Sequence, residues 1–323
     1  MIISQTPLRI SFVGGGTDLE EFYKEHTGMV LSASINKYIY IFIHKHYDSH
    51  RFLLKYSEIE EGDNINKIKN SLIREAMRLT DVNGVEIVSM SDMPTSGIGL
   101  GSSSAFTVGL LNALYAYKGE YKTPDQLAKD ACKIEIEILK KPIGKQDQYI
   151  VSHGDLNTIT FHKDNSVDIE KISLPPRNRQ DLESRLLLFF TGKTRSADKI
   201  LTQQKKNMQN KIESLLKMKN IVTEAKKHLI NDHLDEFGKM LHKNWLEKRR
   251  LARNITNTEI DFYYKRALSG GAMGGKICGA GGGGFLLLYC PIEKQNDIRN
   301  NLADLNEVSF KFENKGSRII LNN

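Results

Sequence analysis

Residues 94–105 combine glycine and serine in a pattern that suits the binding of phosphate groups. The segment reads PTSGIGLGSSSA and lies between a strand-like stretch, residues 85–90, and an apolar stretch of helical length, residues 105–117. Glycines let a backbone approach a ligand without a Cβ clash. The serines stand where a helix would begin, and the N–H groups and dipole of a helix N-terminus bind anions. We therefore predict a phosphate-binding loop, against the plainer alternative of a flexible loop with a serine cap.

Single positions exclude the two commonest phosphate-binding motifs. A P-loop reads GxxxxGK[ST], and although residues 192–194 supply its end, Leu187 stands where the first glycine is required. A dinucleotide fingerprint reads GxGxxG, and Gly14 and Gly16 begin one, but Leu19 occupies its last place. The HRD and DFG segments of protein kinases do not occur in the sequence either. If residues 94–105 bind phosphate, they therefore do so through none of these three motifs.

Three segments, in order along the chain, resemble the signatures of the GHMP kinases, a family named for galactokinase, homoserine kinase, mevalonate kinase and phosphomevalonate kinase. Residues 94–105 are similar to the second signature. Residues 7–18, PLRISFVGGGTD, are similar to the opening motif of the sugar kinases, and residues 276–285, KICGAGGGGF, resemble the third. The resemblance implies an α+β fold of two domains with the active site in the cleft between them, and phosphate transfer from ATP with Mg²⁺.

The resemblance also assigns roles to individual residues. Asp147 matches the catalytic aspartate, which would accept or orient the proton of the attacking hydroxyl, a role that typically contributes ~10²–10⁴-fold in rate. Arg9 matches the arginine beside it, whose permanent charge would keep that carboxylate ionised. Ser103 and Glu135 match the metal ligands, and Glu135 is preferred to Glu137 because it lies twelve residues before the aspartate, as in galactokinase-like members. The nucleotide-binding residues that the resemblance implies are Pro94, Gly97, Gly99, Leu100, Gly101, Ser102, Ser103 and Ser104.

Two glycines separate this chain from galactokinase. Asp18 matches the aspartate that binds sugar hydroxyls, but Gly15 and Gly16 stand where galactokinases carry Glu-His. The missing carboxylate and the added space would suit a sugar with a larger, negatively charged group at that end. Together with residues 142–149, PIGKQDQY, the opening motif is most similar to the D-glycero-D-manno-heptose 7-phosphate kinases. Those enzymes phosphorylate the anomeric hydroxyl to give the 1,7-bisphosphate, on a route to nucleotide-activated heptose for surface polysaccharides.

A phosphorylated sugar requires cations to bind it. Lys193 and Arg195 follow a stretch of buried-strand type, residues 185–190, and are the candidates for phosphate contacts, with Lys145, close to Asp147, as a weaker one. Each could also be an ordinary surface charge. The residues assigned to the substrate side are Gly15, Gly16, Asp18, Lys193, Arg195, Gly281 and Gly282.

A further cationic set lies on one helix. His242, Trp245, Lys248 and Arg249 are spaced by three and four residues and therefore share a face. The simplest interpretation is a packed tryptophan beside solvated cations, and contact with the substrate is the alternative.

Three functions stay open at this point. The first is a heptose 7-phosphate 1-kinase. The second is a kinase of L-fucose or another unphosphorylated sugar, because the fucokinase domain shares the triple-glycine opening. The third is a non-catalytic protein of the same fold that senses a sugar, which should lack the catalytic aspartate or the metal ligands. Asp147, Glu135 and Ser103 are all present, so we place this third function last.

The elements that position these residues mix strands and helices without a regular βαβ alternation, which favours an α+β arrangement over a doubly wound parallel sheet. Thr123 and Pro124 mark a helix start, as N-cap and first helical residue, and that helix is expected to run to about Leu139. The sequence Pro175-Pro176 predicts a boundary between domain 1–176, which holds the nucleotide, the metal and Asp147, and domain 177–323, on the substrate side. Strands are expected at residues 2–13, 29–43, 85–90, 185–190 and 285–290, a hairpin within 152–172, a closing strand pair within 308–321, and helices at 65–79, 105–117, 200–229 and 234–254.

Composition narrows the class of protein. The chain has 323 residues, 40% of them hydrophobic, and its longest apolar runs are far too short to span a bilayer. The three cysteines form no CxxC pair, so no disulfide framework or zinc site is expected, and with no secretory signal we expect a cytoplasmic protein. The net charge is +7, but the lysines of residues 199–227 have no interleaved aromatic residues for base stacking. We therefore expect ATP and a small sugar phosphate as partners, neither nucleic acid nor membrane, and a monomer or homodimer.

Overall fold

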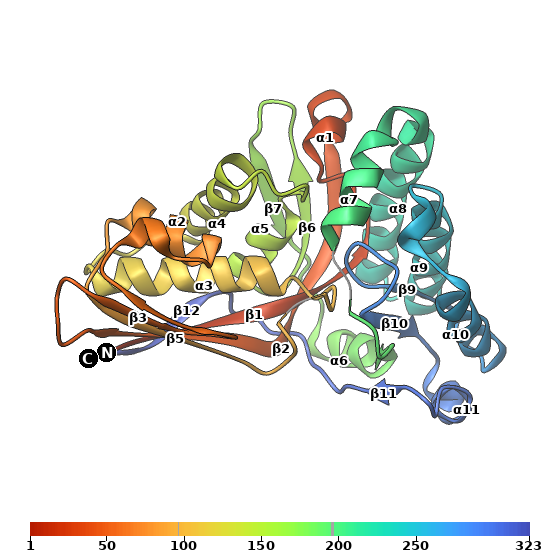
Figure 1. Ribbon diagram of the computed structural model, residues 1–323. Coiled ribbons are helices and arrows are strands. Elements are labelled where there is room, and N and C mark those ends of the chain that lie inside the picture. The colour runs from red at the N-terminus through yellow and green to blue at the C-terminus, as the bar shows by residue number, and fades with distance from the viewer. Residues whose placement is uncertain (96, 195–196) are drawn as a thin grey trace.

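The computed structural model describes residues 1–95, 97–194 and 197–323, and within them two β-sheets carry the helices (Figure 1). The larger sheet has eight strands in the order β12-β1-β2-β5-β3-β4, with β6 pairing β2 and β7 pairing β6. Its strands are β1 (Ile2–Val13), β2 (Gly28–Lys45), β3 (Phe52–Lys55), β4 (Ile59–Gly62), β5 (Val85–Ser91), β6 (Leu156–Phe161), β7 (Val167–Lys171) and β12 (Arg318–Asn322).

The long strands β1 and β2 form the centre of this sheet. β2 is rich in β-branched and aromatic residues and serves two neighbours, because residues 39–45 pair with β5 and residues 28–33 pair with β6. The register between β1 and β2 shifts between Pro7 and Leu8 and again between Ser11 and Val13. Such irregularities bend a strand and re-aim side chains. They flank Arg9, the candidate catalytic arginine.

One helix, α3 (Ser102–Tyr117), packs across β1 and β2 and is buried on nearly every side. It begins three residues before the expected start, so that the serines of the predicted phosphate loop form its first turn. Gly109 lets the helix approach β1, because a Cβ there would lie 2.7 Å from Thr6 Oγ1. The other helices of this part are α1 (Glu20–His26), α2 (Ser71–Thr80), α4 (Pro124–Cys132) and α5 (Gln146–His153).

The predicted helix start is confirmed, because α4 begins at Pro124 with Thr123 as its N-cap, but the helix does not continue in α-helical form to Leu139. Thr123 Oγ1 accepts a hydrogen bond from Gln126 N–H while the Gln126 side chain accepts one from Thr123 N–H, a complete capping box. The α-helix ends at Cys132, and residues Lys133–Ile138 continue as a π-helix. The widened turn carries Glu135, and π-bulges of this kind often mark functional sites.

The smaller sheet has four strands in the order β11-β8-β10-β9, all antiparallel. The expected helix over residues 200–229 is interrupted by a short 3₁₀ turn at Met208–Lys211, which separates α7 from α8. Helices α8 and α9 pack side by side as an antiparallel pair, and α9 covers β9 (Figure 1). The elements are α6 (Pro176–Ser184), β8 (Leu186–Phe190), α7 (Ala197–Lys206), α8 (Ile212–Ile230), α9 (Leu234–Arg249), α10 (Thr258–Ser269), β9 (Gly274–Ile277), β10 (Phe285–Tyr289), α11 (Gln295–Asn301) and β11 (Asn306–Glu307).

The expected closing strand pair within residues 308–321 is wrong, because the end of the chain crosses from one sheet to the other. β11 pairs with β8 in the smaller sheet, and β12 pairs with β1 in the larger one. Between them Phe312 is buried and forms a bridge with Ile35. Residues 318–322 therefore belong with the N-terminal sheet, and we keep a boundary near Pro176 as a proposal for the rest of the chain.

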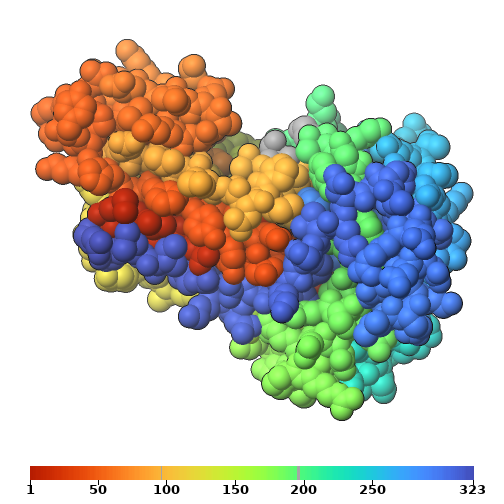
Figure 2. Space-filling model, turned by 90° about the horizontal axis from the view of Figure 1, so that it is seen from below, coloured from red at the N-terminus to blue at the C-terminus, as the bar shows by residue number. Residues whose placement is uncertain are grey.

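Figure 2 shows the surface hollowed between the part coloured orange to yellow and the part coloured green to blue. Among the helices of the described residues, none is long and apolar enough to cross a membrane. Cys132, Cys278 and Cys290 are buried and form no disulfide.

Candidate active site

The hollow contains a cavity of about 880 Å³ that both parts of the molecule line. β1 and the loop after it, the loop before α3, and the start of α5 contribute from the larger sheet. The start of α7, α9, β9 and the third glycine segment contribute from the other side. The cavity thus collects all three glycine segments that the sequence singled out.

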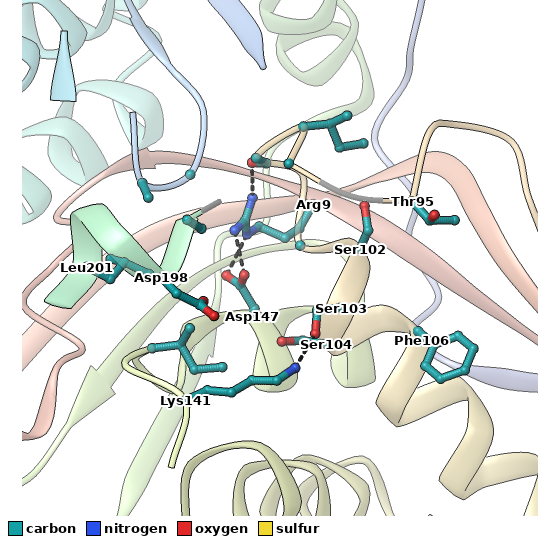
Figure 3. A pocket seen from close by; sticks show the side chains of 18 of the residues that line it. Arg9, Thr95, Ser102, Ser103, Ser104, Phe106, Lys141, Asp147, Asp198 and Leu201 are labelled. Carbon is teal, nitrogen blue, oxygen red and sulfur yellow. Dashed lines mark hydrogen bonds and ion pairs between the residues drawn. The ribbon is translucent and has the colours of Figure 1, made fainter. Parts of the chain in front are cut away.

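Arg9 and Asp147 face each other at the centre of this cavity (Figure 3). Arg9 Nε lies 2.7 Å from Asp147 Oδ1, and Nη2 lies 2.6 Å from Oδ2, so both carboxylate oxygens are held in a bidentate pair. The third guanidinium nitrogen, Nη1, donates to the carbonyl of Gly99 at 2.6 Å. Burial alone would lower the pKa of Arg9, but the nearby Asp147 raises it above its ordinary value. The arginine therefore stays charged and fixes the orientation of the carboxylate.

Glu135 collects four donors although its side chain is fully buried. Ser103 Oγ donates to Oε1 at 2.6 Å, and Ser104 Oγ donates to Oε2 at 2.8 Å. Gln148 Nε2 donates to Oε2 at 2.7 Å, and Lys141 Nζ reaches Oε1 at 3.0 Å. Ser103 and Glu135, the predicted metal ligands, are thus in direct contact.

The ammonium group of Lys141 shows that a cation fits between Ser103 and Glu135. Its ammonium lies 2.8 Å from Ser103 Oγ and 3.0 Å from Glu135 Oε1, so the structure already places a positive charge between the two oxygens. Glu137, the alternative metal ligand, is exposed. No group of three or more His, Cys, Asp or Glu side chains suited to a metal occurs among the residues described. A magnesium ion here would thus have few protein ligands and would complete its shell with phosphate and water, as Mg²⁺ usually does.

The glycines before α3 allow close backbone contact with the third glycine segment. A Cβ on Gly99 would lie 2.3 Å from the Cys278 carbonyl oxygen, and one on Gly284 would lie 2.4 Å from that of Ile98. Gly99 and Gly101 both have positive φ, 78° and 76°, a conformation that favours glycine. The second and third glycine segments therefore pack as one unit, which the sequence alone did not show.

The N-terminus of α3 opens into the cavity beside this unit. Ser102, Ser103 and Ser104 line the cavity, and the Oγ of Ser102 is buried without a hydrogen-bond partner in the described structure. Two predicted nucleotide contacts differ from the rest. Leu100 is fully buried and its carbonyl accepts from Arg9 N–H at 3.0 Å, while Pro94 is not among the described lining residues.

Asp18 lines the same cavity, against the segment that leads to Asp147. Its Oδ1 accepts a hydrogen bond from Gly16 N–H at 2.8 Å, and its side chain is only 4% exposed. Gly144 makes this contact possible, because a Cβ there would lie 2.0 Å from Asp18 Oδ2. Gly15 lines the cavity beside it. The predicted sugar-binding aspartate and the predicted catalytic aspartate are thus coupled through one short loop.

The cations expected at the substrate lie elsewhere or outside the description. Lys193 forms an ion pair with Glu259 and is 64% exposed, and it is not among the described residues that line the cavity. Arg195 lies outside the described residues. Lys145 Nζ lies 4.8 Å from the centre of the Tyr23 ring. Contact of these three with a substrate stays a prediction.

The predicted substrate residues of the third glycine segment contact another part of the fold. Gly281 and Gly282 pack against Ile255, whose carbonyl accepts from Gly282 N–H at 2.5 Å. Gly279, Ala280 and Gly283 line the cavity instead. A direct role of Gly281 and Gly282 at the substrate is still a prediction.

Three lysines that line the cavity were not among the site residues expected from sequence. They are Lys141, Lys248 and Lys276. Only Lys248 gave a signal, as part of the cationic helix face with Trp245. Trp245 itself is fully buried, which confirms the packed tryptophan, but Lys248 is 4% exposed and so is not a solvated cation.

Comparison with known proteins decides the family. Residues 65–155 match the protein family described as GHMP kinases N terminal domain, and residues 225–308 match the family described as GHMP kinases C terminal. The D-glycero-alpha-D-manno-heptose 7-phosphate kinase of Campylobacter jejuni is 30% identical to this chain, over 92% of both chains. The chain belongs to the GHMP kinase family.

Other relatives of this GHMP kinase agree with its fold. The galactokinase of Pyrococcus furiosus is 24% identical over 99% of this chain and 97% of its own. The crystal structure of a D-glycero-D-manno-heptose 1-phosphate kinase from Bacteroides thetaiotaomicron superposes with a TM-score of 0.83, at 23% identity and over 99% of both chains. The family, the two-domain α+β fold and the kinase class expected from sequence are therefore confirmed.

The site of this GHMP kinase can bring two reactants together. The N-terminus of α3 offers N–H groups and serine hydroxyls to phosphates. Asp147, held by Arg9, offers a carboxylate that is 24% exposed to a hydroxyl group in the same cavity. Such an arrangement suits in-line phosphoryl transfer, in which positioning and charge stabilisation dominate catalysis.

Proposed function

We propose that this GHMP kinase is a sugar kinase that transfers the γ-phosphate of ATP to the anomeric hydroxyl of D-glycero-D-manno-heptose 7-phosphate, giving the 1,7-bisphosphate. The observation that carries the chemistry is the Arg9–Asp147 pair, which faces the cavity beside the N-terminus of α3. The choice of sugar is supported by the Campylobacter jejuni relative and by Gly15 and Gly16, which replace the bulkier pair of galactokinases.

The nucleotide would lie along the loop before α3. Its phosphates would meet the N–H groups and hydroxyls of residues 101–104. Leu72, Met90 and Phe106 line the cavity beyond this loop, and Figure 3 shows Phe106 on the far side of α3 from Asp147. These apolar side chains would receive the adenine ring, because a flat aromatic base gains from burial against apolar surface.

Magnesium would be held by Ser103 and Glu135, with Lys141 close by. When bound, the ion would neutralise charge that builds on the β- and γ-phosphates during transfer. Lys141 Nζ contacts both oxygens, so its ammonium would turn towards the phosphates when the ion is present. Gln148 and Ser104 would keep the other Glu135 oxygen in place.

The acceptor hydroxyl would donate its hydrogen bond to Asp147. This carboxylate would take the proton, or hold the hydroxyl in line, as the oxygen attacks the γ-phosphate. Arg9 would hold the carboxylate in place through its bidentate contact and would oppose negative charge that develops nearby. Asp18 would bind a further sugar hydroxyl and set the register of the ring.

A substrate panel tests this proposal. ADP release would be measured with purified enzyme, ATP and Mg²⁺ on heptose 7-phosphate, the unphosphorylated heptose, L-fucose, galactose and mannose. We expect the highest kcat/KM with heptose 7-phosphate. Strong turnover of L-fucose with none of heptose 7-phosphate would instead identify the unphosphorylated-sugar kinase. Sugar binding with no ADP release on any sugar would identify the sugar-sensing protein.

A further inference from the structure

Two buried lysines line the part of the cavity near Asp18, the predicted sugar-binding aspartate, and we call this part the sugar end. Lys276 on β9 is 2% exposed and Lys248 on α9 is 4% exposed, and both line the cavity. The charged ammonium of Lys276 is costly to bury unless an anion pairs with it, and an anion at this place would also meet Lys248. We propose that Lys248 and Lys276 form an anion subsite that binds the phosphate group which the sugar already carries. This inference rests on the proposed function for the identity of the sugar phosphate.

The ammonium of Lys276 has N–H donors that no described residue accepts. Its Nζ donates to the carbonyl of Ser11 at 2.7 Å, its one hydrogen bond to the residues described, so two N–H donors remain. No carboxylate of the described residues lies within ion-pair distance of this ammonium. The hydroxyl of Ser11 also lines the cavity and is buried without a partner in the same part of the structure. A phosphate would satisfy both groups at once.

Lys248 approaches the same backbone segment from the other side. Its Nζ lies 3.1 Å from the Gly15 carbonyl and 3.1 Å from Gln204 Oε1. Gln204 is 1% exposed, and its Nε2 has no hydrogen-bond partner among the residues described. This amide stands beside the ammonium as a second donor that is not yet used.

The absence of a side chain at Gly16 lets the Gln204 amide and the Lys248 ammonium approach the sugar end of the cavity. Its φ is +109°, and a Cβ there would lie 2.4 Å from Gln204 Nε2 and 3.4 Å from Lys248 Nζ. The space opened by the glycine is therefore filled by an amide and an ammonium. Gly15 differs, because a Cβ there would meet Ser11 Oγ and Gln146 Nε2 only at ordinary contact distance.

The position of the subsite favours the sugar over the nucleotide as the source of the anion. Both lysines donate to the segment between Ser11 and Gly15, which leads directly to Asp18. The nucleotide loop instead lies at the N-terminus of α3. An anion held by the lysines would therefore sit at the Asp18 side of Asp147, where the far end of an acceptor sugar belongs.

The electrostatics of Lys276 make binding depend on pH. Burial lowers the pKa of Lys276 to about 8, with Arg9 on β1 acting in the same direction and Cys278, Asp18 and Asp147 opposing it. Burial also raises the pKa of the Cys278 thiol, which is therefore neutral near pH 7. The ammonium is present at pH 7 and is lost as the pH rises through about 8. Affinity for a phosphorylated sugar should fall over that range, and affinity for an unphosphorylated sugar should not.

The test compares K248M and K276M with the wild type on two sugars that differ only in the phosphate. With heptose 7-phosphate, each variant should lose at least tenfold more kcat/KM than with the unphosphorylated heptose. Equal losses on the two sugars would overturn the subsite, because they would indicate a structural or nucleotide role. Affinity for AMP-PNP and the circular dichroism spectrum should match those of the wild type, which shows that the site still folds.

Two control lysines complete the comparison. Lys217 on α8 is half exposed and pairs with Glu213, so K217M should leave both sugars unaffected. K193M removes the cation expected from sequence, and a phosphate-selective loss in K193M but not in K248M or K276M would overturn the inference. In the wild type, KM for heptose 7-phosphate should rise above pH 8, and in K276M that rise should be absent.

A binding experiment separates failure of the subsite from failure of the proposed function. Calorimetry in the presence of AMP-PNP would compare mannose 6-phosphate with mannose, whether or not heptose 7-phosphate is turned over. Tighter binding of the phosphorylated member, lost in K248M, supports the subsite even if the heptose proposal fails. No preference for the phosphorylated member, together with turnover of heptose 7-phosphate that neither lysine affects, would overturn the subsite and leave the kinase assignment intact.

Discussion

Replacement of Gly144 by alanine is the most specific steric test of the proposed sugar site. The added Cβ would lie 2.0 Å from Asp18 Oδ2, 2.4 Å from its Cγ and 2.7 Å from its carbonyl oxygen. Ordinary contact begins at 3.4 Å, so the carboxylate or the loop that carries Asp147 must move by more than about 1 Å. Gly144 does not have a positive φ, and alanine can therefore adopt its backbone conformation. The effect is steric rather than conformational.

The expected magnitude follows from this displacement. Misplacement of a reacting group by about 1 Å can cost roughly 10²-fold in rate. We therefore expect kcat/KM for the sugar to fall about 10²-fold, with the affinity for AMP-PNP within about threefold of the wild type, since the α3 loop is untouched. Overpacking should also lower the free energy of unfolding by about 1–3 kcal/mol.

The assay is coupled ADP release with varied sugar, together with calorimetry of AMP-PNP binding and urea unfolding. Gly119→Ala is the matched control, because a Cβ at Gly119 meets nothing within 4 Å. Its φ is +74°, so the control should lose about 1 kcal/mol of stability without a change in kcat/KM. A folded Gly144→Ala enzyme with kcat/KM within about threefold of the wild type would refute the coupling of Asp18 to the catalytic loop.

Three further predictions concern the reaction centre. Asp147→Asn should lower kcat by ~10²–10⁴-fold with AMP-PNP affinity unchanged, as measured by ADP release and calorimetry. Glu135→Gln and Ser103→Ala should each raise the Mg²⁺ concentration that gives half-maximal rate, by about tenfold, in a titration at fixed ATP. Lys276→Met should raise the free energy of unfolding at pH 7, because the buried charge costs the folded wild type about 3 kcal/mol, offset by the ~1 kcal/mol of its hydrogen bond to a backbone carbonyl. Folding lowers the pKa of Lys276 from 10.5 to about 8, so between these two pH values the unfolded chain binds the proton more tightly than the folded one. The free energy of unfolding of the wild type should therefore rise relative to that of the variant as the pH increases across this range.

Each of these has an outcome that counts against it. Turnover retained by Asp147→Asn would remove the aspartate from the reaction. An unchanged Mg²⁺ requirement in both metal-site variants would move the ion to other ligands. A stability difference between wild type and Lys276→Met that is the same at pH 7 and pH 10, in urea unfolding, would show that the lysine is not held at an unfavourable pKa.

The sequence predicted those parts of the fold whose signals are local. β-branched and aromatic residues predicted β2, and the Thr123-Pro124 pair predicted the start of α4, because strand propensity and helix capping depend on residues close together in the sequence. The π-helical turn at Lys133–Ile138 was not expected, since a widened turn has no local pattern of its own. The destination of β12 was also missed, because its partner β1 lies at the other end of the chain.

The candidate site divides in the same way. Ser103, Glu135 and Asp147 were predicted as site residues because they match motifs of the GHMP kinases, and the structure places all three at one cavity or in contact with a residue that lines it. Lys276 was missed as a site residue although it stands in the third motif, because its ammonium meets Ser11 across 265 positions of sequence. Only the folded chain shows which of 46 lysines and arginines point into the cavity.

The position of the new phosphate tests the proposed function most directly. Purified enzyme would be incubated with ATP, Mg²⁺ and D-glycero-D-manno-heptose 7-phosphate, and the product examined by ³¹P NMR with and without proton decoupling. We predict two phosphate signals in equal amount, the second coupled to the anomeric proton of the sugar, and formation of this product at least about 10²-fold slower with Asp147→Asn. A single sugar-phosphate signal, or a second phosphate coupled to any proton other than the anomeric one, would contradict the proposal.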